Sequence, residues 1–152
     1  MDLIKESLPL IMTIVGIVIS IVLSGVGSSK GASAVGKAAA ALISEQPEKF
    51  GQALVLQMMS ASQGLYGFIV GFLIFINIGD SMTFELGLRC LGAGALMGIS
   101  GLLTAIPQAG IATAGIQILA KKPEHSTKGV LLSAMVETYA IFAFVVSVLI
   151  IL

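Results

Sequence analysis

Apolar residues run along the chain in four long stretches that short polar segments separate. No charged side chain occurs in residues 7–29, 50–79 and 90–120, and the fourth stretch, 129–152, holds one, Glu137. Each stretch exceeds the roughly 20 residues that a helix needs to cross about 30 Å of hydrocarbon. Because the stretches lack the alternation of barrel strands, the pattern predicts an all-α membrane protein with four transmembrane helices.

Composition supports a membrane protein and excludes an ordinary soluble domain. Of the 152 residues, 57% are hydrophobic and 11% are charged, and the mean hydropathy is +1.06. Soluble domains have about 25% charged residues. The formal net charge is zero, which gives no indication of a nucleic-acid partner, and the lone cysteine says nothing about the redox compartment.

The polar loops predict how the helices are oriented in the membrane. Loops 44–50 and 120–128 each contain a proline that ends the preceding helix, and both belong on one membrane face because two helices separate them. Four lysines lie on this face, whereas the opposite face has Lys5 and Arg89. The four are Lys49, Lys121, Lys122 and Lys128. The positive-inside rule therefore predicts that these loops are cytoplasmic and that both termini lie outside.

The sequence also repeats itself at half its length. A shift of 76 residues superposes Pro47 on Pro123 and other matching residues without a gap. We expect a single membrane domain over 1–152 that consists of two fused, duplicated helical hairpins, residues 1–76 and 77–152. Because each hairpin crosses the membrane twice, both have the same orientation, unlike inverted repeats.

The two hairpins differ at the one intramembrane acid. Glu137 aligns with Ala61, so only the second hairpin has the carboxylate. Counting about 1.5 Å per residue from the loop prolines places Ser62 and Gln63 roughly 22 to 24 Å deep, with Gln108 and Glu137 at about 21 to 22 Å. Polar side chains from three helices are therefore expected to share one layer of the membrane.

A carboxylate in this layer predicts either a protonated acid or a bound cation. Burying the charge costs about 2.5 to 3.5 kcal/mol on insertion scales, and no lysine or arginine lies at the depth of Glu137. A bare alkali cation needs several oxygens, whereas a proton needs only the acid and at most one hydrogen-bond acceptor. Candidate ligands are Glu137, Gln63, Gln108, Ser62 and a freed backbone carbonyl near Met59. Tyr66 is expected to hydrogen-bond the carboxylate and fix its rotamer.

Three stretches of the sequence resemble a known family. With the duplicated hairpins, "EKFGQALVLQMMSASQGLYGF", "AGIQILAKKPEH" and "MVETYAIFAFV" closely resemble the proteolipid (K, or c) subunit of bacterial V-type/A-type rotary ATPases, especially the sodium-translocating members. The resemblance implies a rotor-ring subunit that carries Na⁺ on Glu137 across the membrane while the ring turns, coupled to ATP hydrolysis or synthesis. A ring that carries H⁺ is the alternative within the same family.

The resemblance also implies partners and site residues. Identical subunits would form a homo-oligomeric ring in lipid, beside a stator membrane subunit that supplies an arginine and half-channels, with a central-stalk subunit at the cytoplasmic loops. The chain itself would do no catalytic chemistry, because soluble partner subunits handle ATP. The family's sodium site matches Glu137, Gln63, Gln108, the hydroxyl of Ser62, the carbonyl of Met59 and Tyr66.

Two residues depart from that pattern. Ser62 stands where sodium-type relatives are expected to have threonine, so its hydroxyl has more rotamer freedom. Pro107 directly precedes Gln108, and an interior proline usually kinks a helix. The position of Gln108 therefore depends on how the helix passes Pro107.

Two other classes of membrane protein fit part of the pattern. Small multidrug-type cation/proton antiporters also depend on one membrane glutamate, but theirs lies in the first helix with aromatic residues for organic cations. Here Glu137 lies in the fourth helix, and the chain has no tryptophan. A structural four-helix channel would not require the layered carboxylate and amides. A ring of many copies would distinguish a rotor from a dimeric antiporter.

Overall fold

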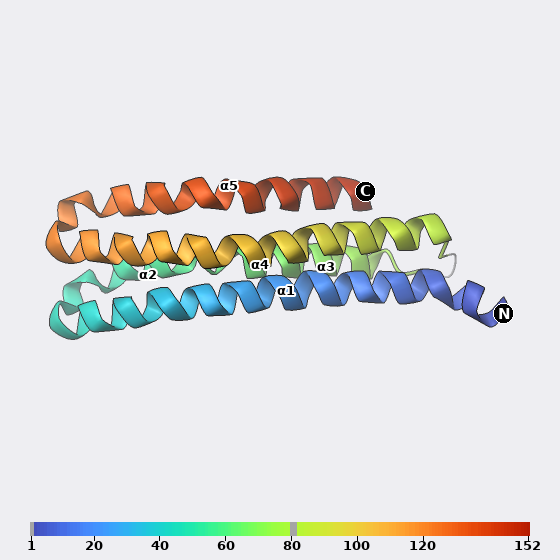
Figure 1. Cartoon of the computed structure of the whole chain (residues 1–152), viewed down its shortest axis with the longest axis horizontal. Coiled ribbons are helices and arrows are strands. Elements are labelled where there is room, and N and C mark those ends of the chain that lie inside the picture. The colour runs from blue at the N-terminus through green and yellow to red at the C-terminus, as the bar shows by residue number, and fades with distance from the viewer. Residues whose placement is uncertain (1, 80–81) are drawn as a thin grey trace.

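Long helices lie side by side and make up almost the whole molecule (Figure 1). The computed structural model describes residues 2–79 and 82–152. The helices are α1 (Asp2–Glu45), α2 (Phe50–Met59), α3 (Ser62–Ile76), α4 (Phe84–Lys121) and α5 (Ser126–Ile151), with 3₁₀ turns η1 (Pro47–Lys49) and η2 (Pro123–His125). Both chain ends lie at one end of the bundle, and the two 3₁₀ turns lie at the other.

The helices provide the four expected membrane spans, and one of them is broken. Three spans, 7–45, 84–121 and 123–151, are each long and apolar enough to cross a membrane. The fourth consists of α2 and α3, which meet at an angle of 48° where Ser60 and Ala61 interrupt the helix. The break agrees with the expected free backbone carbonyl near Met59, although neither proline nor glycine stands at residues 60 and 61 to mark it.

The two hairpins fold alike where they turn. The amide of Gln46 donates to the carbonyl of Leu42 at 2.9 Å, and the amide of Lys122 donates to that of Ile118 at 2.8 Å. Backbone φ and ψ are −136° and 69° at Gln46 and −145° and 76° at Lys122. Gln46 and Lys122 are 76 residues apart, as are Leu42 and Ile118, so the turn geometry follows the repeat.

Lys49, a lysine of the first loop, is buried and not exposed at the surface. Its side chain is 9% exposed, and Nζ donates to the carbonyls of Leu119 and Ala120 at 3.0 and 3.1 Å. A cation at the C-terminal end of a helix satisfies free carbonyls and complements the helix dipole. Lys49 of the first hairpin therefore caps α4 of the second and fastens the two hairpins together.

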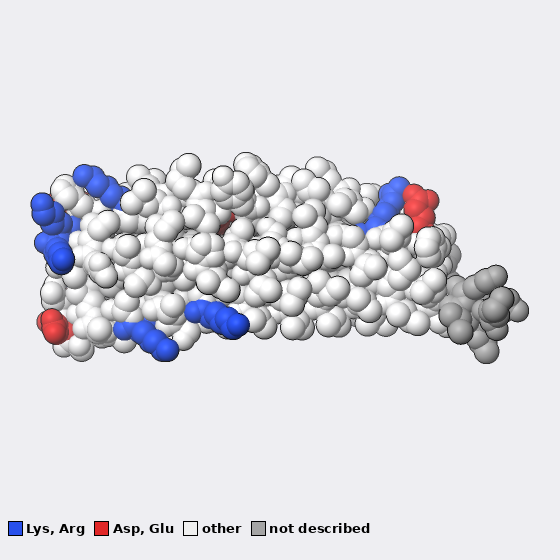
Figure 2. Space-filling view, viewed as in Figure 1, with Lys and Arg blue, Asp and Glu red and all other residues white. Residues whose placement is uncertain are grey.

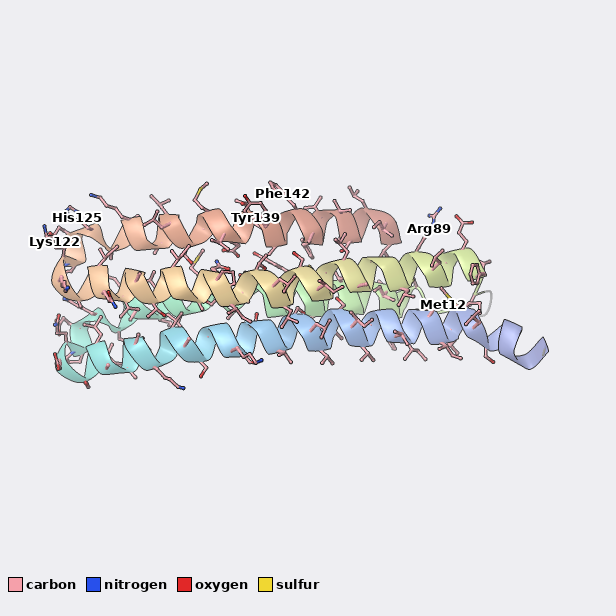
Figure 3. The ribbon with its side chains drawn as sticks, viewed as in Figure 1. Met12, Arg89, Lys122, His125, Tyr139 and Phe142 are labelled. Carbon is pink, nitrogen blue, oxygen red and sulfur yellow. The ribbon has the colours of Figure 1, made fainter. Side chains whose placement is uncertain are left out.

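Small residues let α1 and α4 approach closely. A Cβ atom on Gly27 would lie 2.7 Å from the carbonyl oxygen of Gly101, and one on Gly94 would collide with the carbonyl of Gly16. Small residues at such contacts are the usual means of close packing between membrane helices. Large side chains project outwards elsewhere, including Tyr139 and Phe142 on α5, which point away from the other helices in Figure 3.

Charged side chains gather mostly towards the two ends of the bundle, as one face shows in Figure 2. Lys122 and His125 lie at the end that holds the turns, and Arg89 lies at the opposite end (Figure 3). Arg89 pairs there with Glu85 at 2.7 Å on the exposed surface of α4. The surface between the ends is mostly apolar in this view, as a membrane-spanning bundle requires, although blue side chains also lie partway along its lower edge.

Candidate functional site

Glu137 lies on α5 and accepts hydrogen bonds from two other helices. The hydroxyl of Tyr66 on α3 donates to Oε1 at 2.7 Å, and Nε2 of Gln108 on α4 lies 3.5 Å from Oε2. The ring of Phe144 packs against that of Tyr66, with centroids 5.3 Å apart. The carboxylate is therefore held between α3, α4 and α5, with the tyrosine in the orienting position that the sequence predicted.

Two glutamines extend this arrangement into the interior. Nε2 of Gln63 on α3 donates to Oε1 of Gln108, and both side chains are fully buried. Oε1 of Gln63 is also buried and has no hydrogen-bond partner within the described residues. Leaving a buried acceptor unsatisfied costs about 1 to 3 kcal/mol. Such an oxygen is available to a ligand that enters the site.

The break between α2 and α3 lies beside Gln63 in the sequence. The hydroxyl of Ser62 donates to the carbonyl of Met59 at 3.0 Å across the break. Ser62 and Met59 thus contact each other, but no hydrogen bond in the described part of the chain joins this pair to Glu137 or the glutamines. The structure brings four of the six predicted residues into one hydrogen-bonded chain and places the other two at the helix break.

Ser28 holds the break in place, and sequence reasoning missed it. Its hydroxyl donates to the carbonyl of Ala61 at 3.1 Å and accepts from the amide of Gly64 at 2.6 Å, so α1 supplies the partners that the interrupted helix lacks. About two turns earlier on α1, Ser20 donates to the carbonyl of Gly67 at 2.8 Å. The regular spacing of Ser20, Ser24 and Ser28, four residues apart on one face of α1, was the available signal.

Pro107 does not prevent Gln108 from reaching the site. α4 continues without interruption from Phe84 to Lys121 through the proline. Gln108 follows directly and contacts both Gln63 and Glu137. The sequence left open whether Gln108 contacts the site past Pro107, and the structure shows that it does.

The donor set has one negative charge and several neutral oxygens. Glu137 supplies the carboxylate, and two buried amides and the tyrosine surround it. Nowhere in residues 2–79 and 82–152 do three histidine, cysteine, aspartate or glutamate side chains come together. Hard oxygen ligands with a single charge suit a monovalent cation better than a transition metal, which favours nitrogen or sulfur ligands.

Comparison with known proteins places the chain in a family. The family model for the C subunit of ATP synthase matches residues 15–74 and again 91–150. The two matches begin and end 76 residues apart, so they follow the repeat found in the sequence and in the turns. The duplicated-hairpin architecture is confirmed.

Individual relatives agree with the family match. The chain is 51% identical over 150 residues to the K subunit of the V-type sodium ATPase of Enterococcus hirae, covering 99% of this chain and 96% of the relative. It is 34% identical over 141 residues to the K subunit of the A-type ATP synthase of Methanocaldococcus jannaschii, covering 93% of this chain and 62% of that one. It is 24% identical over 136 residues to the 16 kDa proteolipid of the human V-type proton ATPase, covering 90% and 88%. The chain is therefore an integral membrane protein of the family of ATP synthase C subunits, the proteolipid subunits of rotary ATPases.

Proposed function

We propose that this proteolipid carries Na⁺ across the membrane on Glu137, with Gln63, Gln108, Ser62 and the carbonyl of Met59 as further oxygen ligands. The observation that supports this most directly is the buried, unpartnered Oε1 of Gln63, joined through Gln108 to the carboxylate. A site made for a proton alone would need the acid and no spare amide oxygen. The sodium ATPase named for the Enterococcus hirae relative agrees with this choice.

Each side chain has a distinct task in the proposed site. Glu137 supplies the charge that compensates the cation, and Gln63 offers its unpartnered Oε1. The amide of Gln108 now points its nitrogen at Glu137 and its oxygen at Gln63, so it would rotate to offer its oxygen to the ion. Tyr66 keeps its hydrogen bond to Oε1, and the ion would replace the long contact of Gln108 at Oε2. The carbonyl of Met59 lies where α2 ends and accepts from the hydroxyl of Ser62, so these two oxygens would approach the ion together. Filling the site would neutralise the half-buried charge and so let the loaded subunit face lipid.

The same proposal covers the assembly and its direction in the membrane. Copies of the chain form a ring; a stator subunit beside it supplies an arginine and two half-channels through which ions enter and leave Glu137. The loops at 44–50 and 120–128 face the cytoplasm and the central stalk, and both termini face outwards. Their placement at opposite ends of the bundle supports this arrangement. Soluble partner subunits hydrolyse or synthesise ATP.

Carbodiimide labelling of Glu137 tests the identity of the ion. Carbodiimides react with the protonated acid, so at fixed pH we expect increasing sodium to slow the labelling of membranes that contain the protein, whereas potassium at equal ionic strength does not. The matched variant Gln63→Met removes the spare oxygen and keeps most of the volume, so labelling should persist in it with much weaker sodium protection. Labelling that ignores sodium in the unaltered protein would overturn the sodium site and favour a proton ring.

A further inference from the structure

Ser133 on α5 has a buried hydroxyl outside the ligand set of the candidate site. Its side chain is fully buried, and Oγ has no hydrogen-bond partner within the described residues. Serine and threonine inside a helix often donate to a carbonyl three or four residues earlier, as Thr138 does to Met135 at 2.8 Å. Ser147, also buried on α5, donates instead to the carbonyl of Ala93 at 3.0 Å. A buried hydroxyl with neither kind of bond is uncommon and is available to a ligand.

Two contacts between α5 and α4 place Ser133 relative to the carboxylate. A Cβ atom on Gly129 would lie 2.7 Å from Cα of Gly115, so the two helices touch there. Eight residues later on α5, Glu137 meets Gln108. Ser133 is midway between Gly129 and Glu137, and residues four apart share a helical face. Ser133 therefore lies one helical turn from Glu137, on the side towards the 3₁₀ turns.

The break between α2 and α3 lies at the level of Ser133. A Cβ atom on Gly115 would lie 2.7 Å from the side chain of Leu56 on α2. Gln63 of α3 comes seven residues after Leu56 and bonds the glutamine that meets the carboxylate. The carbonyl of Met59 falls between these two levels, as Ser133 does. One layer next to the site therefore holds the hydroxyl of Ser133 and the carbonyl of Met59.

A groove between α2 and α5 leads from the 3₁₀ turns towards this layer. It has a volume of about 320 Å³, and its lining residues are Gln52, Val55, Ser126, Thr127 and Val130. Nε2 of Gln52 donates to Oγ of Ser126 at 3.2 Å, so the groove is polar where it begins. Val130 lies one helical turn before Ser133. The groove thus ends one turn short of the buried hydroxyl.

One face of α5 joins the groove to the carboxylate. In order from the 3₁₀ turn, this face carries Ser126, Val130, Ser133 and Glu137. Intervals of four, three and four residues keep side chains on one side of a helix. Ser126 belongs to the groove and Glu137 to the site, so Ser133 is the polar residue between them.

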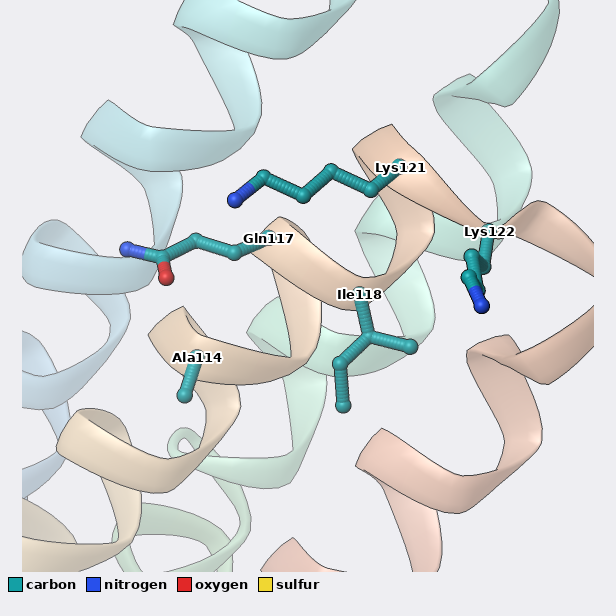
Figure 4. A pocket seen from close by; sticks show the side chains of 5 residues that line it. All are labelled: Ala114, Gln117, Ile118, Lys121 and Lys122. Carbon is teal, nitrogen blue, oxygen red and sulfur yellow. The ribbon is translucent and has the colours of Figure 1, made fainter.

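A second hollow near the 3₁₀ turns does not lead to the site (Figure 4). It has a volume of about 400 Å³, and Figure 4 shows Gln117 and Lys121 projecting from α4 in a common direction. The other lining residues are Ala114, Ile118 and Lys122. Gln108 lies nine residues before Gln117, and nine residues are two and a half helical turns, so the two face opposite ways. Of the two hollows, the groove between α2 and α5 is the one that approaches Glu137.

We infer that an ion reaches and leaves Glu137 from the 3₁₀ turns along the groove between α2 and α5, with Ser133 as a positioning residue for the last step. A cation must exchange its water for protein oxygens before it enters a buried site. The hydroxyl of Ser133 and the carbonyl of Met59 replace part of that water one turn before the carboxylate. This inference rests on the proposed function and adds that the subunit itself forms part of the path.

Sodium exchange separates the path from the site. The purified, detergent-solubilised protein is loaded with radioactive sodium and chased with unlabelled sodium, and the release rate is measured together with the sodium Kd. A path residue lowers the barrier to entry and to release alike, so Ser133→Ala should slow release by about tenfold and leave the Kd unchanged. The matched control is Ser147→Ala, on the other side of Glu137 on α5, which should release sodium at the unaltered rate.

The outcomes of this exchange experiment are distinct. An unaltered release rate in Ser133→Ala would overturn the path. Faster release with a raised Kd would make Ser133 part of the site and would overturn the path as well. Absence of sodium binding in the unaltered protein would instead overturn the proposed function.

Reaction with silver ions tests the path without a sodium measurement. Ag⁺ is a monovalent cation that reacts with thiols, and Ser133→Cys and Ala140→Cys each place a thiol at a buried position about one turn from Glu137, on opposite sides. In a Cys90→Ala background, we expect Ag⁺ to consume the thiol of Ser133→Cys several-fold faster than that of Ala140→Cys. Adding Val130→Phe, which fills the inner end of the groove, should slow only the first reaction. Equal rates for the two thiols would contradict the path.

Discussion

Among the residues that the structure describes, the carboxylate of Glu137 has neutral hydrogen-bond partners. A tyrosine hydroxyl and a glutamine amide donate to it, and it takes part in no salt bridge within the described residues. Hydrogen bonds from neutral donors hold a carboxylate in place without cancelling its charge. In the proposed function, a cation that enters the site would supply the missing compensation.

At this scale, Tyr66→Phe should weaken sodium binding without abolishing it. The substitution keeps the ring against Phe144 and removes the hydroxyl that holds Oε1. A hydrogen bond to a charged group contributes about 1.5 to 3 kcal/mol, so we expect the sodium Kd to rise by about tenfold or more. Sodium titration of carbodiimide labelling measures this change. An unaltered Kd would show that Tyr66 has no part in orienting the carboxylate.

The residues that the sequence revealed are those whose chemistry is unusual for their depth. Glu137, Gln63 and Gln108 stand out because acids and amides are costly in an apolar helix, and counting residues from the loop prolines placed them in one layer. Ser28 did not stand out, because small polar residues are common in membrane helices and bond their own backbone as readily as a neighbour's. Its partners became visible only when α1 was placed against α3.

The broken span carries two residues of the candidate site, Gln63 and Tyr66, directly after its break. α2 ends at Met59 and α3 begins at Ser62, so the carbonyls at the break do not all have helical partners. Ser28 on α1 satisfies both sides of the break at once. The sequence predicted four spans from the lengths of its uncharged stretches and a free carbonyl near Met59. It could not predict what holds the break, because the hydrogen bond comes from a residue 33 positions earlier.

Ser28→Ala should therefore destabilise both the protein and the site. Removing the hydroxyl leaves the carbonyl of Ala61 and the amide of Gly64 without their partner, at a cost of about 1 to 3 kcal/mol. We expect a lower Tm in detergent and weaker sodium protection of Glu137. The control is Ser44→Ala, whose hydroxyl bonds its own helix on the exposed end of α1. Equal behaviour of the two variants would mean that Ser28 does not support the break.

Over the whole molecule, duplication gives two similar hairpins of which one carries the acid. The turns repeat closely, yet Ala61 stands in the first hairpin where Glu137 stands in the second. The site combines Gln63 and Tyr66 of the first hairpin with Gln108 and Glu137 of the second, so neither hairpin forms it alone. The fusion of two hairpins therefore accounts for one complete site in each chain.

Direct measurement of bound sodium tests this account most plainly. Radioactive sodium is equilibrated with the purified, detergent-solubilised protein at an alkaline pH, where carboxylic acids are ionised. The number of sodium ions bound per chain is then measured. We predict saturable binding of one sodium ion per chain in the unaltered protein and none in Glu137→Gln, which has the same size without the charge. Sodium binding that persists in Glu137→Gln, or that never saturates in the unaltered protein, would contradict a carboxylate site for Na⁺.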